Sequence, residues 1–240
     1  MNGKTIDPPG WYGKIASLGD FASRRLPPGF IAVWDAWLQQ VISVSRSQLG
    51  DGWLDAYLTC PVWRFLLQPG VYGESLWAGV LMPSVDRVGR YFPLTVVSEL
   101  SALPTTEREL RSLCLWLEQI ETLALSTLDT TCSPQRFDDQ ILATPLPWEP
   151  VVPSRISLAR RLLATLHNEE MALLELPSAD ALPEALADVG GLLSGDVSRG
   201  VSLWWAQGTS GSSAPLLVCH GLPDTRRFAV MLRPAPPQNL

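Results

Sequence analysis

The chain has 240 residues and a formal net charge of −6, with 46% hydrophobic and 18% charged residues. This length and composition are typical of one globular domain with a sizeable core, so we expect a single domain over residues 1–240. The negative charge gives no overall attraction for nucleic-acid phosphates or anionic lipids, although it leaves room for a local arginine patch. For this reason we expect no binding of nucleic acid. Because the sequence has neither a secretory signal nor a long apolar stretch, we expect a cytoplasmic protein that does not insert into membranes.

The first predicted elements are an extended segment and a helix. Residues 11–19 are typical of an extended segment, and the sequence Pro-Pro-Gly at residues 27–29 separates them from a helical pattern. A second, short helix is expected around residues 51–58, ending before Pro61, because proline restricts the residue that precedes it. The apolar positions that form one stripe on the first helix are Phe30, Trp34, Trp37, Leu38, Val41 and Ile42.

Three strands and a long helix are predicted next. The strand segments are short, rich in strand formers and separated by Gly, Pro, Ser and Asp; they are residues 62–67, 76–82 and 94–97. A helix is expected over residues 106–128, where Thr106 and Glu109 have the spacing of a capping box. Its apolar face comprises Leu110, Leu113, Leu117, Ile120 and Ala124.

The last part of the chain is expected to return to the sheet. Residues 143–154 contain four prolines and indicate an ordered-loop boundary, and the Gly/Ser-rich residues 208–213 are typical of a mobile hairpin loop. Helices are expected near residues 157–167 and 182–193, followed by two or three strands, at 201–206, 216–219 and 228–232. Early strands in 10–100, a helical middle in 104–195 and late strands in 200–233 favour an α/β (mixed α+β) fold: a single domain with a mixed, largely antiparallel sheet flanked by helices. We expect the late strands to share that sheet with the early ones.

Signatures of common enzyme classes are sparse. The sequence has no GxGxxG, P-loop or GxSxG motif, and its two histidines, His167 and His220, have no neighbours at metal-ligand spacing. We therefore expect a protein that is not an enzyme and that needs neither cofactor nor metal.

Charged residues gather in two turns, residues 13–21 and 82–93. The second turn carries Asp86, Arg87 and Arg90 between two apolar strands. Guanidinium groups offer several donors in a fixed fork and pair well with carboxylates. The candidate acceptors are Asp20 and Asp86, and the candidate donors are Arg24, Arg64, Arg87 and Arg90.

These charges have two interpretations. They either pin the turns through internal ion pairs or contact a partner, and the sequence leaves both open. If the turn is partly buried, its charges need compensation. We expect Asp86 or Arg90 to pair with a charged side chain from another segment, with Asp20 or Arg64 as the first candidates.

The tryptophans are mostly expected in the core. Trp34, Trp37 and Trp63 lie within apolar patterns. Neighbouring residues on a strand point to opposite faces, so one of Trp204 and Trp205 could face solvent.

Long motifs in the chain resemble the TagF/ImpM family. They are GWYGK at 10–14, GDF at 19–21, RRLP at 24–27, WDAWL at 34–38, PVWRF at 61–65, GVLMPSVDRVGRYFPL at 79–94, SLWW at 202–205 and GLP at 221–223. The resemblance is dense over residues 10–100 and weaker over 200–230. It implies a cytoplasmic, non-enzymatic protein that restrains type VI secretion after translation by binding a forkhead-associated scaffold protein.

The resemblance transfers no catalytic residue. The candidate binding or fold-defining residues are therefore those of the matching motifs: Lys14, Asp20, Phe21, Arg24, Arg64, Ser84, Asp86, Arg87, Arg90 and Trp204. The alternative function is a small-ligand sensor or an enzyme that uses the Asp/Arg cluster around residues 20 and 84–90. A concave pocket with convergent polar groups would favour this alternative, and a flat surface with exposed aromatic residues would favour a binding protein.

We predict that all four cysteines are free thiols, because they lie scattered in apolar sequence in a chain expected to be cytoplasmic. Alkylation of the unfolded, unreduced protein should add four labels by intact-mass measurement. Fewer than four labels would show that a disulfide is present.

Overall fold

The protein is described by a computed structural model. The residues described are 8–101, 103–104, 106–146, 171–176, 182–183, 186, 199–206 and 214–232. The helix expected at 157–167 and the loop expected at 208–213 lie outside them, as does most of the helix expected at 182–193.

Within the described residues, eight strands form one sheet in the order β2-β1-β5-β4-β3-β7-β8-β6. The strands are β1 (Gly10–Gly13), β2 (Ala22–Arg24), β3 (Trp63–Leu67), β4 (Leu76–Met82), β5 (Leu94–Leu100), β6 (Met171–Leu176), β7 (Val201–Ala206) and β8 (Ala214–His220). Every described pairing is antiparallel. Because β3 pairs with β7, strands from both ends of the sequence share the sheet, as predicted.

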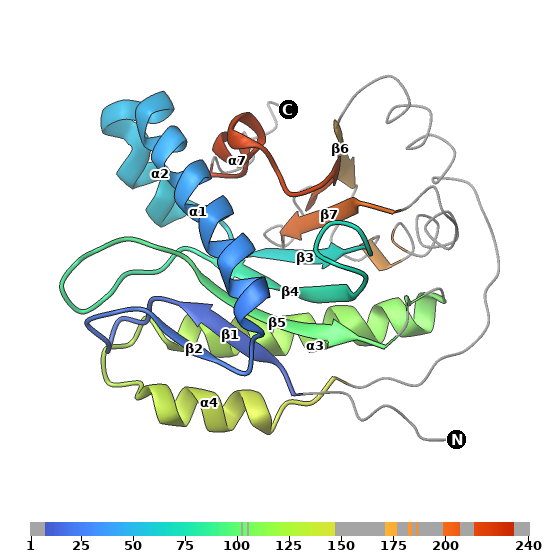
Figure 1. The fold of residues 1–240 in the computed structure, drawn as a ribbon, viewed down its shortest axis with the longest axis horizontal. Coiled ribbons are helices and arrows are strands. Elements are labelled where there is room, and N and C mark those ends of the chain that lie inside the picture. Colours follow the sequence, from blue (N-terminus) through green and yellow to red (C-terminus); the bar gives the residue numbers. More distant parts are fainter. Residues whose placement is uncertain are drawn as a thin grey trace.

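Helices cover both faces of the sheet (Figure 1). They are α1 (Pro28–Leu49), α2 (Trp53–Thr59), α3 (Glu107–Ser126), α4 (Pro134–Leu142) and α7 (Thr225–Met231), with a 3-10 turn at Gly50–Gly52. One hydrophobic cluster joins the sheet to α1, α2 and α7, and the other joins it to α3 and α4. The α/β prediction is thus confirmed.

The core against α1 is largely aromatic. The apolar stripe predicted on this helix is buried in full. Trp34 packs against Phe65 of β3 and Trp204 of β7, with ring centroids 5.2 and 6.2 Å away. Its indole Nε1 donates to the Thr95 hydroxyl over 2.8 Å, so the polar edge of a buried ring is satisfied.

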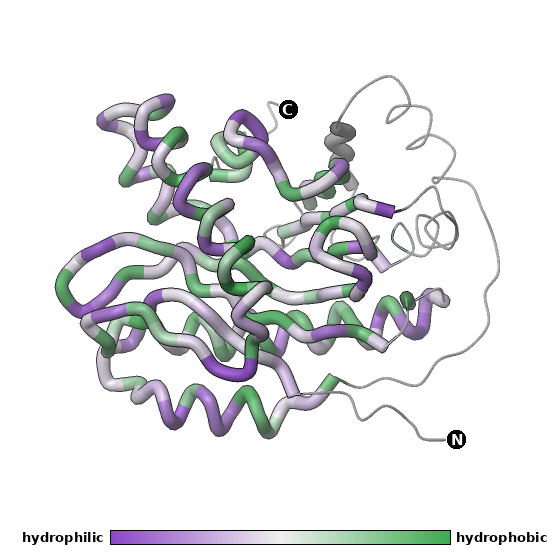
Figure 2. The backbone as a smooth tube through the Cα atoms, viewed as in Figure 1, coloured by the Kyte–Doolittle hydropathy of each residue, from purple (hydrophilic) through white to green (hydrophobic). Residues whose placement is uncertain are grey.

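On the other face, α3 begins as the sequence predicts. The Thr106 hydroxyl accepts the Glu109 N–H, and the Glu109 carboxylate accepts the Thr106 N–H, which completes the capping box. The predicted apolar face is buried. Hydrophobic and hydrophilic residues alternate along this helix, as a helix packed on one side requires (Figure 2).

The prediction of a strand at 228–232 is wrong, because residues 228–231 lie in α7 and Leu232 is its C-cap. The Asp224 carboxylate accepts the N–H groups of Arg226 and Arg227 and so caps a helix there. Phe228 then packs edge-on against Trp37 of α1, with ring centroids 6.0 Å apart. The apolar run is therefore explained by burial against a helix.

Both Trp204 and Trp205 are fully buried, so the expectation that one could face solvent is not met. Their rings do point to opposite faces: Trp204 belongs to the cluster beneath α1, and Trp205 to the cluster beneath α3. Strand β7 lies inside the sheet, and helices cover both of its faces, so both positions are core.

The short strand β2 and two later elements were not predicted from the sequence. Strand β6 has the sequence MALLEL, whose residues favour helices, yet it pairs with β8 along its whole length. Helix α4 begins at Ser133, whose hydroxyl accepts the Arg136 N–H, and Pro134 occupies its first turn. The helical middle expected over residues 104–195 therefore also contributes a strand.

No helix among the described residues is both long and apolar enough to cross a bilayer. Cys114, Cys132 and Cys219 are buried, and Cys60 is partly exposed. Burial raises the pKa of the Cys60 thiol to about 12 and that of Cys114 to about 11. The reactive thiolate is thereby suppressed, so alkylation has to be measured on the unfolded protein.

Asp138 of α4 ties that helix to the edge of the sheet. Its carboxylate accepts Trp11 Nε1 at 2.7 Å and both terminal nitrogens of Arg25 at 2.6 and 2.8 Å. The Arg25 hydrogen bonds hold the pKa of Asp138 below its ordinary value; burial opposes this shift, and the Trp11 bond adds to it.

We predict that Asp138→Asn lowers the free energy of unfolding at pH 7 by about 1–2 kcal/mol, because the amide keeps an acceptor for Trp11 but loses the charge that binds Arg25. A carboxyl with a lowered folded pKa stabilises the protein above its unfolded pKa, here near 3.8, and loses this contribution as the pH falls through the folded pKa. The difference from wild type should therefore shrink at about pH 3. Urea unfolding at both pH values measures it. Asp139→Asn, an exposed change in the same helix, is the control, and an equal effect of both variants would contradict the prediction.

Candidate functional site

The two charged turns of the sequence meet at one end of the sheet. One turn, residues 14–21, connects β1 to β2, and the other, residues 83–93, connects β4 to β5. Strands β1 and β4 both pair with β5. Their last residues, Gly13 and Met82, both pair with Leu94, so the two turns begin side by side. We call these two segments the paired turns.

Close approach of the backbones requires a glycine at the base of the paired turns. Gly13 has φ of 140°, which side chains rarely adopt, and a Cβ there would lie 2.2 Å from the Pro93 carbonyl oxygen. A larger residue would push the two turns apart.

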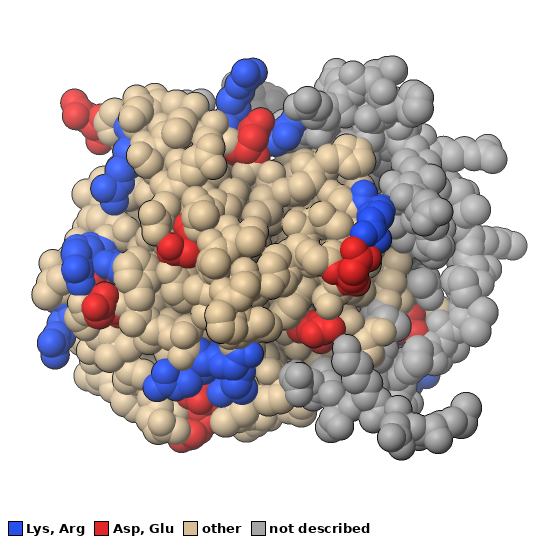
Figure 3. Space-filling view, viewed as in Figure 1, with Lys and Arg blue, Asp and Glu red and all other residues tan. Residues whose placement is uncertain are grey.

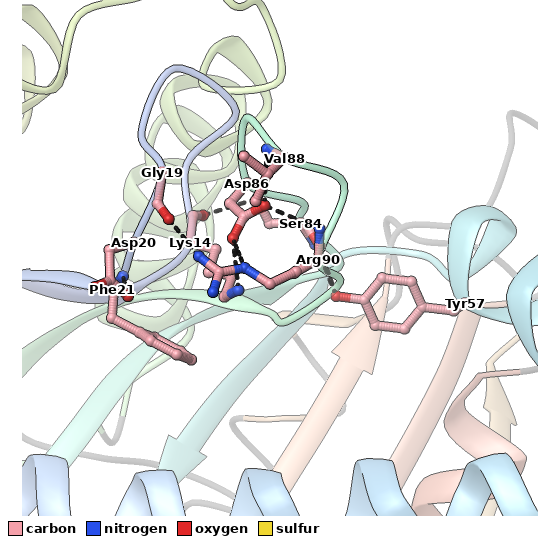
Figure 4. Close-up of polar contacts among 9 residues, drawn as sticks. All are labelled: Lys14, Gly19, Asp20, Phe21, Tyr57, Ser84, Asp86, Val88 and Arg90. Atoms are coloured by element: carbon pink, nitrogen blue, oxygen red, sulfur yellow. Dashed lines mark hydrogen bonds and ion pairs between the residues drawn. The ribbon is translucent and has the colours of Figure 1, made fainter.

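Asp86 is the centre of the site (Figure 4). Its Oδ2 atom lies 2.7 Å from Lys14 Nζ and 2.7 Å from Arg90 Nε. Its Oδ1 atom accepts the backbone N–H groups of Val88 and Arg90 at 3.0 and 2.9 Å. The side chains of Lys14 and Asp86 are 5% and 0% exposed, so this is a buried ion pair between the two turns.

Hydrogen bonding decides the charge state of Asp86. Burial by itself would raise the pKa of this carboxyl, but the bonds from Lys14, from the Arg90 backbone and side chain, and from the Val88 N–H outweigh it. The pKa is held well below its ordinary value. Asp86 is therefore an anion with both oxygens occupied, which makes it a poor proton acceptor.

Further bonds join the paired turns. The Arg87 N–H donates to the Leu18 carbonyl over 2.8 Å, the Ser84 hydroxyl donates to the Lys14 carbonyl over 2.8 Å, and an Arg90 terminal nitrogen donates to the Gly19 carbonyl. These bonds hold the two turns as one unit.

A third element supports the second turn. Tyr57 of α2 accepts the Ser84 N–H at 3.0 Å and donates its hydroxyl proton to the Ser84 carbonyl at 2.9 Å. Burial is the main reason that the pKa of Tyr57 lies well above its ordinary value, so this hydroxyl stays protonated. Tyr57 therefore positions the start of the turn.

Phe21 forms the aromatic border of the site. Its ring packs edge-on against Phe92 at 4.8 Å and stacks with Tyr12 at 5.9 Å. Lys14 Nζ lies 4.9 Å from the ring centroid, within cation–π distance. The residue is nevertheless 44% exposed, so part of a large apolar side chain contacts water.

The expected charged partner of Asp86 is present, but its identity was predicted wrongly. The partner from another segment is Lys14, and neither Asp20 nor Arg64 takes that role. Asp20 is exposed, and its carboxylate accepts the N–H of Phe21. Arg64 is buried on the face covered by α3, where it pairs with Glu118 and Glu121 at 3.3 and 2.8 Å.

The remaining candidates divide between the site and the rest of the fold. Ser84, Arg87 and Arg90 belong to the paired turns. Arg24, on the edge strand β2, lies over the Trp11 ring at 5.6 Å. Trp204 is a core residue whose Nε1 donates to the Ser202 hydroxyl.

The role of Lys14 could have been recognised in the sequence. It is one of two lysines in the chain and lies between Gly13 and an apolar run, where a charge needs compensation. No comparable signal marks Tyr57, because a tyrosine in a short amphipathic helix is unremarkable. Among the described residues, no group of three or more His, Cys, Asp or Glu is placed to hold a metal ion.

We predict that Asp86→Ala lowers the melting temperature by on the order of 10 °C, because it leaves the Lys14 ammonium buried without its counter-charge. Asp20→Ala is the matched control; it removes an exposed carboxylate from the same site and should leave the melting temperature nearly unchanged. Calorimetry or thermal circular dichroism measures both variants. An unchanged melting temperature in Asp86→Ala, with weaker binding of a partner, would instead assign Asp86 to a contact surface.

Comparison with known proteins identifies the family. A sequence model described as the TagF N-terminal domain, type VI secretion system-associated, matches residues 10–144. The crystal structure of PA0076 from Pseudomonas aeruginosa PAO1 is similar over 97% of this chain and 97% of that one, with 38% identity and a TM-score of 0.67. No curated protein gives a significant match. The matched residues include the paired turns, and the chain belongs to the TagF N-terminal domain family of type VI secretion-associated proteins.

Proposed function

We propose that the protein is a cytoplasmic, non-enzymatic negative regulator of type VI secretion, which acts after translation by binding a forkhead-associated scaffold protein of the secretion system. Membership of a secretion-associated family supports a role in this machinery. The observation that carries the proposal further is that the paired turns contain two kinds of residue, an inner set and an exposed set. Their inner charges compensate one another, while Phe21 and Arg87 are exposed.

The chemistry of Asp86 argues for binding over catalysis. A general base needs a lone pair that reaches the substrate and a pKa near the working pH. Asp86 has both oxygens occupied and a pKa well below the ordinary range. An enzyme that uses this Asp/Arg cluster, the alternative from the sequence, would have to break an internal ion pair before each reaction.

The exposed residues have the composition of a contact surface. Aromatic residues and arginine are enriched at protein–protein interfaces and dominate their binding energy. A small-ligand sensor would instead need polar groups that converge in a concave pocket. At the paired turns the converging polar groups bind each other.

Binding to the scaffold can be measured directly. The purified protein should bind the purified forkhead-associated scaffold from the same organism in isothermal titration calorimetry, and overproduction in cells should reduce export of a type VI substrate. The control is the scaffold titrated with buffer alone and cells carrying an empty vector. Reduced export without scaffold binding would show that regulation occurs through another partner, and unchanged export with binding would contradict the inhibitory role.

A further inference from the structure

Positive charge is concentrated around the paired turns. The paired turns contain one Lys, two Arg and two Asp, a net charge of +1, and Arg24 follows on β2. The whole chain carries −6, so the residues outside the paired turns together carry −7. Figure 3 shows Lys and Arg side chains gathered at the edge where Figure 1 places these turns. This edge therefore differs in sign from the rest of the protein.

Arg87 supplies an uncommitted guanidinium at this edge. The residue is exposed, and its side chain has no hydrogen bond or ion pair within the part of the chain that the structure describes. Its Nη2 lies 3.7 Å from the position that a Cβ on Gly19 would take. Its backbone N–H is bonded to Leu18, so the base of the side chain is held while the charged end remains available.

Arg90 places a second guanidinium at the same glycine. Its Nε binds Asp86, and one terminal nitrogen donates to the Gly19 carbonyl. The side chain is still 56% exposed. The other terminal nitrogen has two N–H groups that neither of these bonds uses. Two guanidinium groups thus lie close to Gly19, and each can donate to a carboxylate outside the protein.

Phe21 adds an apolar contact next to these charges. Its ring lies 4.9 Å from Lys14 Nζ, and in Figure 4 it points away from Asp86. One part of the ring is packed on Phe92 and Tyr12, and 44% of the residue is open to water. An aromatic side chain held by packing loses little conformational entropy when a partner covers it.

We propose that Phe21, Arg87 and Arg90 form a docking surface for an acidic segment of a partner protein that also carries an apolar side chain. Carboxylates of that segment bind the two guanidinium groups, and its apolar side chain covers Phe21. The proposal rests on the proposed function, which makes the forkhead-associated scaffold the partner. The buried Lys14–Asp86 pair keeps the surface in its binding geometry, because it joins the two turns that carry these residues.

The charge distribution favours an acidic segment of a protein over an extended polyanion. A nucleic acid would run beyond the small positive edge and meet the −7 carried by the rest of the chain. A short acidic segment needs only the edge itself. A second copy of this chain is also acidic overall, so the experiment has to separate self-association from binding of the scaffold.

The decisive variant is Arg87→Glu, which reverses one exposed charge without breaking a described side-chain contact. The matched control is Arg226→Glu, because Arg226 of α7 is an exposed arginine that also lacks a side-chain bond within the described residues, and α7 lies away from the paired turns (Figure 1). Titration calorimetry with the purified scaffold at about 50 and 300 mM salt gives the dissociation constants. We expect Arg87→Glu to weaken binding about tenfold or more, and Arg226→Glu to stay within about twofold of wild type. Wild-type binding should weaken with salt.

The outcomes separate the surface from the function. If wild type and Arg87→Glu bind the scaffold equally, the docking surface is wrong and the proposed function stands. If wild type does not bind the scaffold at all, the proposed function fails, and the partner assigned to this surface fails with it. If light scattering shows that wild type self-associates and Arg87→Glu does not, the occupant is a second copy, which also overturns the proposal. Equal melting temperatures of the variants confirm that each comparison is made on folded protein.

Discussion

A buried ion pair between Lys14 and Asp86 is the interaction on which the geometry of the motif-bearing end depends. Moving two charges out of water is unfavourable, and their attraction offsets this cost only when geometry and additional hydrogen bonds are good. Here the Asp86 carboxylate accepts two backbone N–H groups and one Arg90 nitrogen besides Lys14. The pair joins residues that lie 72 positions apart in the chain, and together with the other bonds between the two turns it holds them against each other.

The layered core holds the strands that carry these turns. Indole and phenyl rings of α1, β3 and β7 pack beneath one face of the sheet, and α3 and α4 cover the other. The sheet is therefore packed on both sides, and β1, β4 and β5 have little freedom to shift relative to one another. Such a platform presents the paired turns with a defined geometry and so lowers the entropic cost of binding a partner.

The family motif has an inner and an outer part with different physical roles. Ser84, Asp86 and the Arg90 Nε group hold the turn from inside, together with Tyr57 and Lys14. Arg87 and Phe21 face water from the same two turns. Internal pinning therefore applies to the inner residues, and the partner contact proposed above concerns the outer ones. A turn so rich in charge is therefore well packed and still carries the surface proposed for binding.

The sequence by itself determined the elements whose signals are local: the apolar stripe of α1, the capping box of α3, strands β4 and β7 and the α/β class. Only the tertiary structure decided two other elements. Segment β6 is a strand because pairing with β8 outweighs its helix-favouring residues. Segment α7 is a helix because a cap at Asp224 and packing on α1 outweigh its strand-favouring residues. The same holds for the site. The sequence pointed to Asp86 and Arg90, but strand pairing decides which residue is the partner of Asp86. Lys14 follows β1, which pairs with β5, and so reaches Asp86, whereas Arg64 faces the carboxylates of α3. Strand order is a long-range property that local composition does not encode.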